Sequence, residues 1–96
     1  MTNSYSNMAN KRTLKHAINL ICEELFSEAV AASLYGKEQH QEDAEALVFS
    51  IIKMRNNYIS RISHAEPGMK PKVYFSDLRE NFNAEVGDMA DQINNL

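Results

Sequence analysis

Three histidines are the side chains of this chain best suited to binding a metal or moving a proton. They stand at positions 16, 40 and 64, near a predicted helix start, in a predicted loop and near a predicted helix end. Zinc sites on helices need closely spaced ligands, such as the HExxH pattern or clustered Cys and His. Because neither pattern occurs, we expect solvent-exposed histidines and no metal site.

Glutamates cluster at positions 23, 24 and 28, and such clusters hold di-iron centres in some helical bundles. Those centres need a Glu-x-x-His motif from each of two helices. Phe26 follows Glu23 by three positions and Ser27 follows Glu24, so the motif is absent. The chain also has only three glycines, too few for a phosphate-binding loop. We therefore predict no catalytic residue and no cofactor, with a non-catalytic subunit of an enzyme complex as the alternative.

Arg55 is the charged residue that fits its surroundings least well. A helical wheel places it within an apolar arc, between Ile51 and Ile62. A charge there must extend to solvent, form a pair or face another chain. Folding the second and third predicted helices back on one another brings position 55 level with Glu85. This predicts an interhelical Arg55–Glu85 pair, and the alternative is an Arg55 that extends along the surface.

A second candidate site is basic and aromatic. Residues 53–79 hold six basic and two acidic residues, a net charge of +4, whereas the whole chain carries −3. Basic side chains interleaved with aromatic rings can hold phosphates and stack on bases. The candidate residues of such an anion- or nucleic-acid-binding module, in the loop 61–79, are Arg61, Lys70, Lys72 and Arg79. The overall acidity argues against nucleic acid as the main partner, and a merely solvated end of the fold is the alternative.

Three amphipathic helices are the elements that would position these residues. Apolar residues recur at steps of three and four over residues 13–35, 42–64 and 76–95. Short links between helices of this length favour antiparallel neighbours. The sequence thus predicts an all-α fold, a three-helix antiparallel (up-down-up) bundle in one domain, residues 13–96. Residues 1–12, rich in Asn and Ser, are predicted to form a flexible polar tail.

Local signals set the ends of these helices. Gly36 follows the first helix and suits a left-handed position there. Pro67 cannot continue the second helix, and Ser76 suits the N-cap of the third. Residues 65–74 between them have no helical period. A short strand at residues 72–75 is possible within this segment, although nothing else in the chain is expected to pair with it.

Composition restricts the class of protein and its location. The 96 residues suffice for one domain with a modest core. Cys22 is the only cysteine, which excludes an internal disulfide framework. The chain is 24% charged and has no apolar run near the ~20 residues of a membrane span. Its first residues are polar and lack the apolar core of a signal peptide. These features predict a cytoplasmic protein that does not enter a membrane.

The first predicted helix carries more apolar surface than two neighbouring helices easily cover. Phe26, Val30 and Leu34 extend beyond its main stripe, and Phe49 lies outside the stripe of the second helix. Exposed apolar groups at this density usually mark a contact surface, and two-fold dimers are the commonest oligomers. We therefore predict a protein–protein interaction or structural module that self-associates, so that a homodimer completes the bundle. The alternatives are another protein as partner, or a tail or loop that covers this surface.

Overall fold

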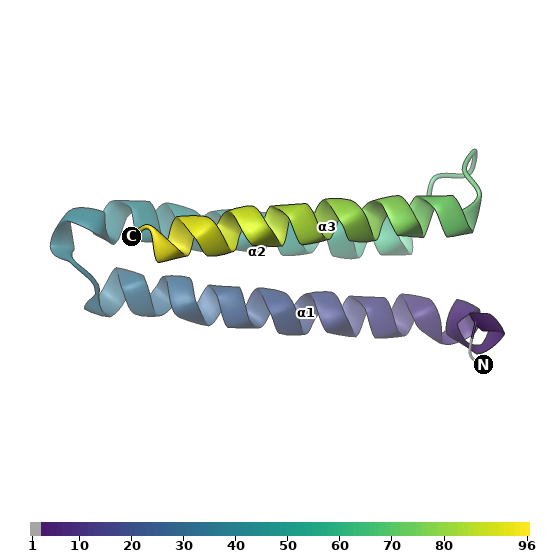
Figure 1. Cartoon of the computed structure of the whole chain (residues 1–96), viewed down its shortest axis with the longest axis horizontal. Helices are drawn as coiled ribbons and strands as arrows, with labels where there is room; N and C mark the ends of the chain where they lie inside the picture. The colour runs from purple at the N-terminus through teal and green to yellow at the C-terminus, as the bar shows by residue number, and fades with distance from the viewer. Residues whose placement is uncertain (1–2) are drawn as a thin grey trace.

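All regular elements of the structure, a computed structural model, are helical. It describes the backbone of residues 3–96 and the side chains from Lys11 onward. In chain order the elements are α1 (Asn3–Tyr35), the short 3-10 helix η1 (Glu38–His40), α2 (Gln41–Ser63) and α3 (Pro71–Asn94). Figure 1 shows the three long helices side by side along the long axis of a molecule that measures 49 × 27 × 18 Å. The predicted all-α fold is confirmed, and no strand occurs in residues 3–96.

The first helix begins at Asn3 and not at Thr13. The segment predicted as a flexible tail is therefore helical from residue 3 onward, while residues 1 and 2 lie outside the described residues. Extending an existing helix adds one hydrogen bond per residue without a new nucleation cost. A polar segment can thus continue α1 although it has no apolar stripe of its own.

The third helix begins at Pro71 and not near Ser76. Lys70 precedes it in an extended conformation, with φ −64° and ψ 133°, as expected for a residue before proline. Proline suits the first position of a helix because its φ is fixed near the helical value and the N–H it lacks would have no helical acceptor. Residues 72–75 are thus helical and form no strand, and Ser76 lies inside α3 rather than at its N-cap.

Gly36 ends α1 by a close approach and not by a left-handed conformation, because no glycine of the chain has a positive φ. Its N–H donates to the carbonyl oxygen of Ala32 over 2.9 Å. A Cβ atom placed on Gly36 would lie 2.4 Å from that oxygen, nearer than real Cβ contacts come. The predicted left-handed conformation is wrong, although the chain does need a glycine at this position.

The core lies between the three helices, and α2 contributes the most to it. The buried apolar residues recur at steps of three and four, as the helical period requires. They are Ile18, Cys22, Leu25 and Ala29 of α1, Ala44, Leu47, Ile51, Met54, Tyr58 and Ile62 of α2, and Leu78 and Phe82 of α3. Farther along α3, Val86, Met89, Ile93 and Leu96 pack against this core while half-buried. The last turns of α3 are thus less enclosed than its middle, where Leu78 and Phe82 are buried.

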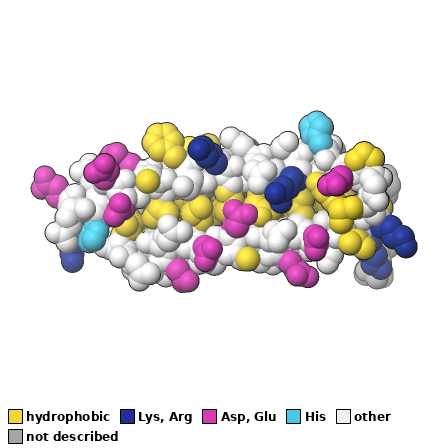
Figure 2. Space-filling model, turned by 90° about the horizontal axis from the view of Figure 1, so that it is seen from above, with side chains coloured by type: hydrophobic (Ala, Val, Ile, Leu, Met, Phe, Trp, Pro, Cys, Tyr) yellow, Lys and Arg dark blue, Asp and Glu magenta, His cyan; other side chains and the backbone are white. Residues whose placement is uncertain are grey.

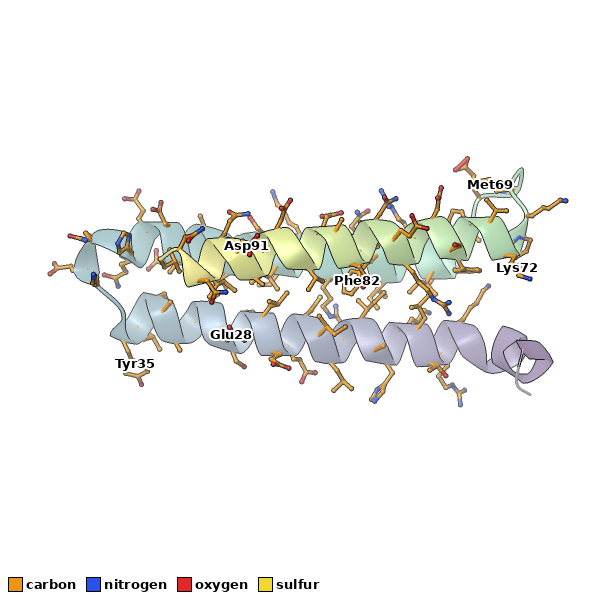
Figure 3. The ribbon with its side chains drawn as sticks, viewed as in Figure 1. Glu28, Tyr35, Met69, Lys72, Phe82 and Asp91 are labelled. Carbon is orange, nitrogen blue, oxygen red and sulfur yellow. The ribbon has the colours of Figure 1, made fainter. Side chains whose placement is uncertain are left out.

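α1 is apolar on more sides than its core stripe. Ile21 and Tyr35 of this helix are 38% and 85% exposed. In Figure 3 Tyr35 points away from the other two helices, whereas Phe82 lies between the helices. A helix with apolar residues on several sides is usually buried on several sides, but these two side chains of α1 are not covered by α2 or α3.

Candidate functional site

Arg55 connects α2 to α1. Its Nε donates a hydrogen bond to Oδ1 of Asn19 over 2.8 Å, and its Nη1 donates to Oδ1 of Asn56 over 2.9 Å. The side chain is exposed, so its charge stays hydrated while its polar head spans the border between the two helices. Arg55 also lies near the buried thiol of Cys22, where burial raises the thiol pKa and Arg55 lowers it in part.

Glu85 connects α3 to α2, but through a tyrosine. The hydroxyl of Tyr58 donates a hydrogen bond to Oε2 of Glu85. The Tyr58 ring is fully buried and meets the Phe82 ring edge to face, with centroids 5.1 Å apart. The guanidinium carbon of Arg61 lies 5.1 Å from the centroid of the same ring, within the range of a cation–π contact. Burial, the hydrogen bond to Glu85 and its negative charge raise the pKa of Tyr58 to about 12, against an opposing effect of Arg61.

The predicted Arg55–Glu85 pair is therefore replaced by two other interhelical hydrogen bonds. Arg55 and Tyr58 are three positions apart on α2, so their side chains lie at nearly the same height but differ by about 60° around the helix. Arg55 projects toward α1 and Tyr58 toward α3. The predicted position of Arg55 along α2, level with Glu85, was nearly right. The prediction that Arg55 lies on the side of α2 that faces α3 was wrong.

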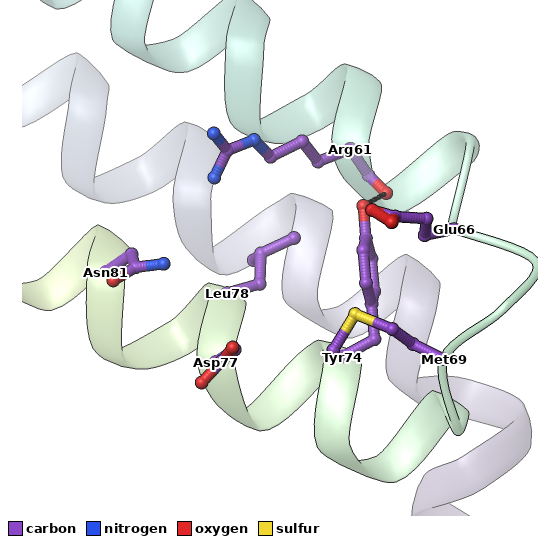
Figure 4. Close-up of a pocket in the computed structure, with 7 residues that line it drawn as sticks. All are labelled: Arg61, Glu66, Met69, Tyr74, Asp77, Leu78 and Asn81. Atoms are coloured by element: carbon purple, nitrogen blue, oxygen red, sulfur yellow. Dashed lines mark hydrogen bonds between the residues drawn. The ribbon is translucent and has the colours of Figure 1, made fainter.

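The four basic candidates are not gathered in one pocket. A hollow at the loop end of α2 and α3, of about 340 Å³, is lined by Arg61, Glu66, Met69, Tyr74, Asp77, Leu78 and Asn81. Figure 4 shows these residues and the hydrogen bond by which the Tyr74 hydroxyl donates to the Arg61 carbonyl oxygen, 2.9 Å long. Lys70, Lys72 and Arg79 do not line this hollow. With one basic and two acidic residues in its lining, the hollow is poorly suited to an anion.

The face formed by α2 and α3 looks apolar but is closed. Figure 2 shows apolar side chains running lengthwise along the middle of this face, with acidic side chains along one edge and basic side chains among those of the other. The residues beneath are buried, since Leu47 is 6% and Leu78 is 3% exposed. A second hollow on this face has a mixed lining of His40, Asp43, Ala46, Leu47, Ser50, Gln92, Asn95 and Leu96. No feature of this lining suggests a particular ligand.

The border of α1 and α2 away from α3 is more exposed, and we call it the open seam. The Arg55–Asn19 hydrogen bond locates it. Phe26 lies two turns beyond Asn19 and therefore on the same side of α1, and Val30 and Leu34 continue at four-residue steps. On α2, Val48 and Ile52 lie on the same side as Arg55, and Phe49 lies farther around the helix, away from the core. The open seam consists of Phe26, Val30, Leu34, Val48, Phe49 and Ile52.

Exposure in the open seam is high for residues of this kind. Leu34 and Phe49 are 65% and 67% exposed, Phe26 and Ile52 are 38% and 39%, and Val30 is half-buried. Of the predicted interface residues, Phe26 and Val30 thus flank this border on α1, whereas Leu34 and Phe49 turn farther outward from the core of their helices. Val48 and Ile52 were not among the residues predicted for the interface, although their four-residue spacing puts both on one flank of α2.

The metal and membrane possibilities give no further site. Among the described residues, no three His, Cys, Asp or Glu side chains are grouped closely enough to hold a metal ion. His64 Nδ1 lies 3.1 Å from the Ser60 carbonyl oxygen at the end of α2. No helix in the described part of the chain has both the length and the apolar content to cross a membrane.

Comparisons with protein-family models, with curated proteins and with solved structures give no match. Function is therefore inferred from the chain's own residues, and the open seam holds four of the eight large apolar side chains that are exposed in the described part of the chain.

Proposed function

We propose that this protein is a non-catalytic helical interaction module that self-associates through the open seam. The carrying observation is the exposure of large apolar side chains on two adjacent helices, with Leu34 at 65% and Phe49 at 67%. Contiguous apolar surface of this kind usually marks a site of protein contact. A second copy is the partner that is always present with the chain, and two-fold dimers are the commonest assemblies.

The proposal includes an antiparallel up-down-up arrangement of the three helices. Two contacts between α2 and α3 support it, because the partner number falls as the α2 number rises: Tyr58 contacts Glu85, and Arg61 contacts Tyr74. The short connection between α1 and α2 favours the same arrangement for that pair. In such a bundle the open seam is the border of α1 and α2 opposite α3, and an added helix could cover it from the side.

The solution mass tests self-association directly. We expect light scattering behind size exclusion to give twice the mass of the 10.9 kDa chain at high concentration. Phe49→Glu introduces a charge into the contact and should yield a monomer. The matched control is Val73→Glu, because Val73 is also about half exposed, at 51%, but lies on α3 outside the open seam. This control should remain a dimer.

Two outcomes would contradict the proposal. A wild-type protein that stays monomeric at all accessible concentrations would mean that the seam does not bind a second copy, and a different protein would then be the candidate partner. A dimer that survives Phe49→Glu and Leu34→Glu would mean that self-association uses another surface.

A further inference from the structure

The open seam has opposite charges at its two ends, in addition to its apolar middle. Near one end stand Arg12 and Lys15 of α1 and Arg55 of α2. Arg12 and Lys15 precede Asn19 by seven and four positions, which places them on the same flank of α1. At the other end, η1 and the first turns of α2 form an acidic stretch, residues 38–45, that offers Glu38, Glu42 and Glu45 to the seam, whereas Asp43 lines the hollow beside the end of α3. The charge of the seam therefore changes from basic at one end to acidic at the other.

A surface that is basic at one end and acidic at the other is complementary to a second copy of itself that runs in the opposite direction. Two copies packed in parallel would place like charges together at both ends, which disfavours association. Two copies packed antiparallel would place each basic end against the other's acidic end. An interface around a two-fold axis is made of the same patch on both copies, so the charge order selects the direction of packing.

We propose that a second copy of this chain covers the open seam in antiparallel orientation, with the two-fold axis near residue 50 of α2. This deepens the proposed self-association and rests on it. Residue 50 lies midway between positions 45 and 55, so Arg55 of one protomer faces Glu45 of the partner subunit. Phe49 and Ile52 lie next to the axis and pack against their own counterparts. Arg12 and Lys15 lie toward the partner's acidic stretch.

Arg55 has the free hydrogen-bonding capacity that this contact requires. A guanidinium group carries five N–H donors, and Arg55 uses one at Nε for Asn19 and one at Nη1 for Asn56. The bond to Asn19 holds the side chain across the helix border, while the group stays exposed. An ordered but exposed guanidinium loses less freedom when it binds a carboxylate than a mobile one would.

Single cysteines distinguish the two orientations of a dimer. Ile52→Cys and Leu34→Cys are each made in a Cys22→Ala background and oxidised mildly. In the antiparallel dimer the two copies of residue 52 are about 6 Å apart along the helix axes, and the two copies of residue 34 are about 30 Å apart at 1.5 Å per residue. We expect disulfide-linked dimers from Ile52→Cys and none from Leu34→Cys. If Cys22→Ala loses helicity, the wild-type background serves instead, because Cys22 is only 2% exposed.

A charge exchange tests the proposed contact independently. Arg55→Glu and Glu45→Arg should each weaken dimerisation about tenfold, since each creates two like-charge contacts per dimer. The double variant, in which Glu at 55 faces Arg at 45 of the partner subunit, should recover most of this loss. Lys72→Glu is the control, because Lys72 is an exposed basic residue of α3, outside the open seam.

The outcomes separate this proposal from the one it rests on. Cross-linking at both positions would show a parallel dimer and overturn the orientation while leaving self-association intact. A dimer by mass that links at neither position would place the contact on another face. A double charge variant no better than the single ones would overturn the Arg55–Glu45 contact, whereas a monomeric wild-type protein would overturn self-association itself.

Discussion

Tyr58 is the residue at which the core and the contact between α2 and α3 meet. Its ring is buried against Phe82, and its hydroxyl donates to the exposed Glu85. We expect Tyr58→Phe to lower the free energy of unfolding by about 0.5–1.5 kcal/mol, the usual net value of one hydrogen bond, because Glu85 can regain water. Urea unfolding measures this change. Tyr35→Phe is the control, since Tyr35 is 85% exposed, and an equal effect of both variants would contradict a role for the Glu85 contact.

The same hydroxyl makes stability depend on alkaline pH. The pKa of Tyr58 is raised to about 12 in the folded protein, whereas an unfolded tyrosine titrates near 10. A group with a raised folded pKa contributes stability that is complete below pH 10 and is lost as the pH rises through about 12. We expect the urea midpoint to fall across this window, and to fall less in Tyr58→Phe. Identical pH profiles for both proteins would contradict the assignment.

Residue-level reasoning from the sequence located the height of Arg55 but not its flank. The number of residues between two positions shows how far apart they lie along a helix, and two helices folded about a loop place positions 55 and 85 near one another. It does not show which of two neighbours a side chain at the edge of the stripe will meet. Arg55 turned toward Asn19 and left Glu85 to Tyr58. That choice depends on how α1 packs, which no local pattern encodes.

At the scale of the elements, two glycines allow opposite predictions. A Cβ at Gly36 would lie 2.4 Å from the Ala32 carbonyl oxygen, whereas one at Gly87 meets nothing within 4 Å. Gly87 lies inside α3, where alanine is favoured over glycine by about 0.5–1 kcal/mol. We expect Gly87→Ala to raise the free energy of unfolding by about this amount and Gly36→Ala to lower it. Urea unfolding of both variants tests this, and a stabilising Gly36→Ala would mean that the end of α1 adjusts easily.

The sequence predicted the existence of each helix better than its beginning. The apolar period marks α2, whose observed bounds of Gln41–Ser63 differ from the predicted 42–64 by one residue at each end. The starts of α1 and α3 were missed because neither depends on that period. α1 gains its first turns by propagation into a polar segment, and α3 gains its first turn from the preset φ of Pro71.

At the scale of the whole molecule, the apolar surface of α1 was visible in the sequence, but its distribution was not. The pattern grouped Phe26, Val30 and Leu34 as surplus, yet only the packing of α1 against α2 sets Phe26 and Val30 along the same border as Val48 and Ile52. The basic candidates illustrate the converse, since Arg61 shares its hollow with Glu66 and Asp77. Charge along the chain therefore predicts little about charge in a pocket, because helix packing decides which side chains share it.

The open seam also makes thermal stability depend on protein concentration. A folded dimer that unfolds to two chains gains stability from mass action, so its Tm rises with concentration. For a chain of this size we expect a rise on the order of 3 °C for each tenfold increase. Differential scanning calorimetry over a hundredfold range measures this slope. Phe49→Glu should give a Tm that does not change with concentration, and Val73→Glu should keep the wild-type slope. If the wild type, Phe49→Glu and Val73→Glu all show the same rise of Tm with concentration, then Phe49 does not lie in the dimer contact. Any association would then use a surface other than the open seam.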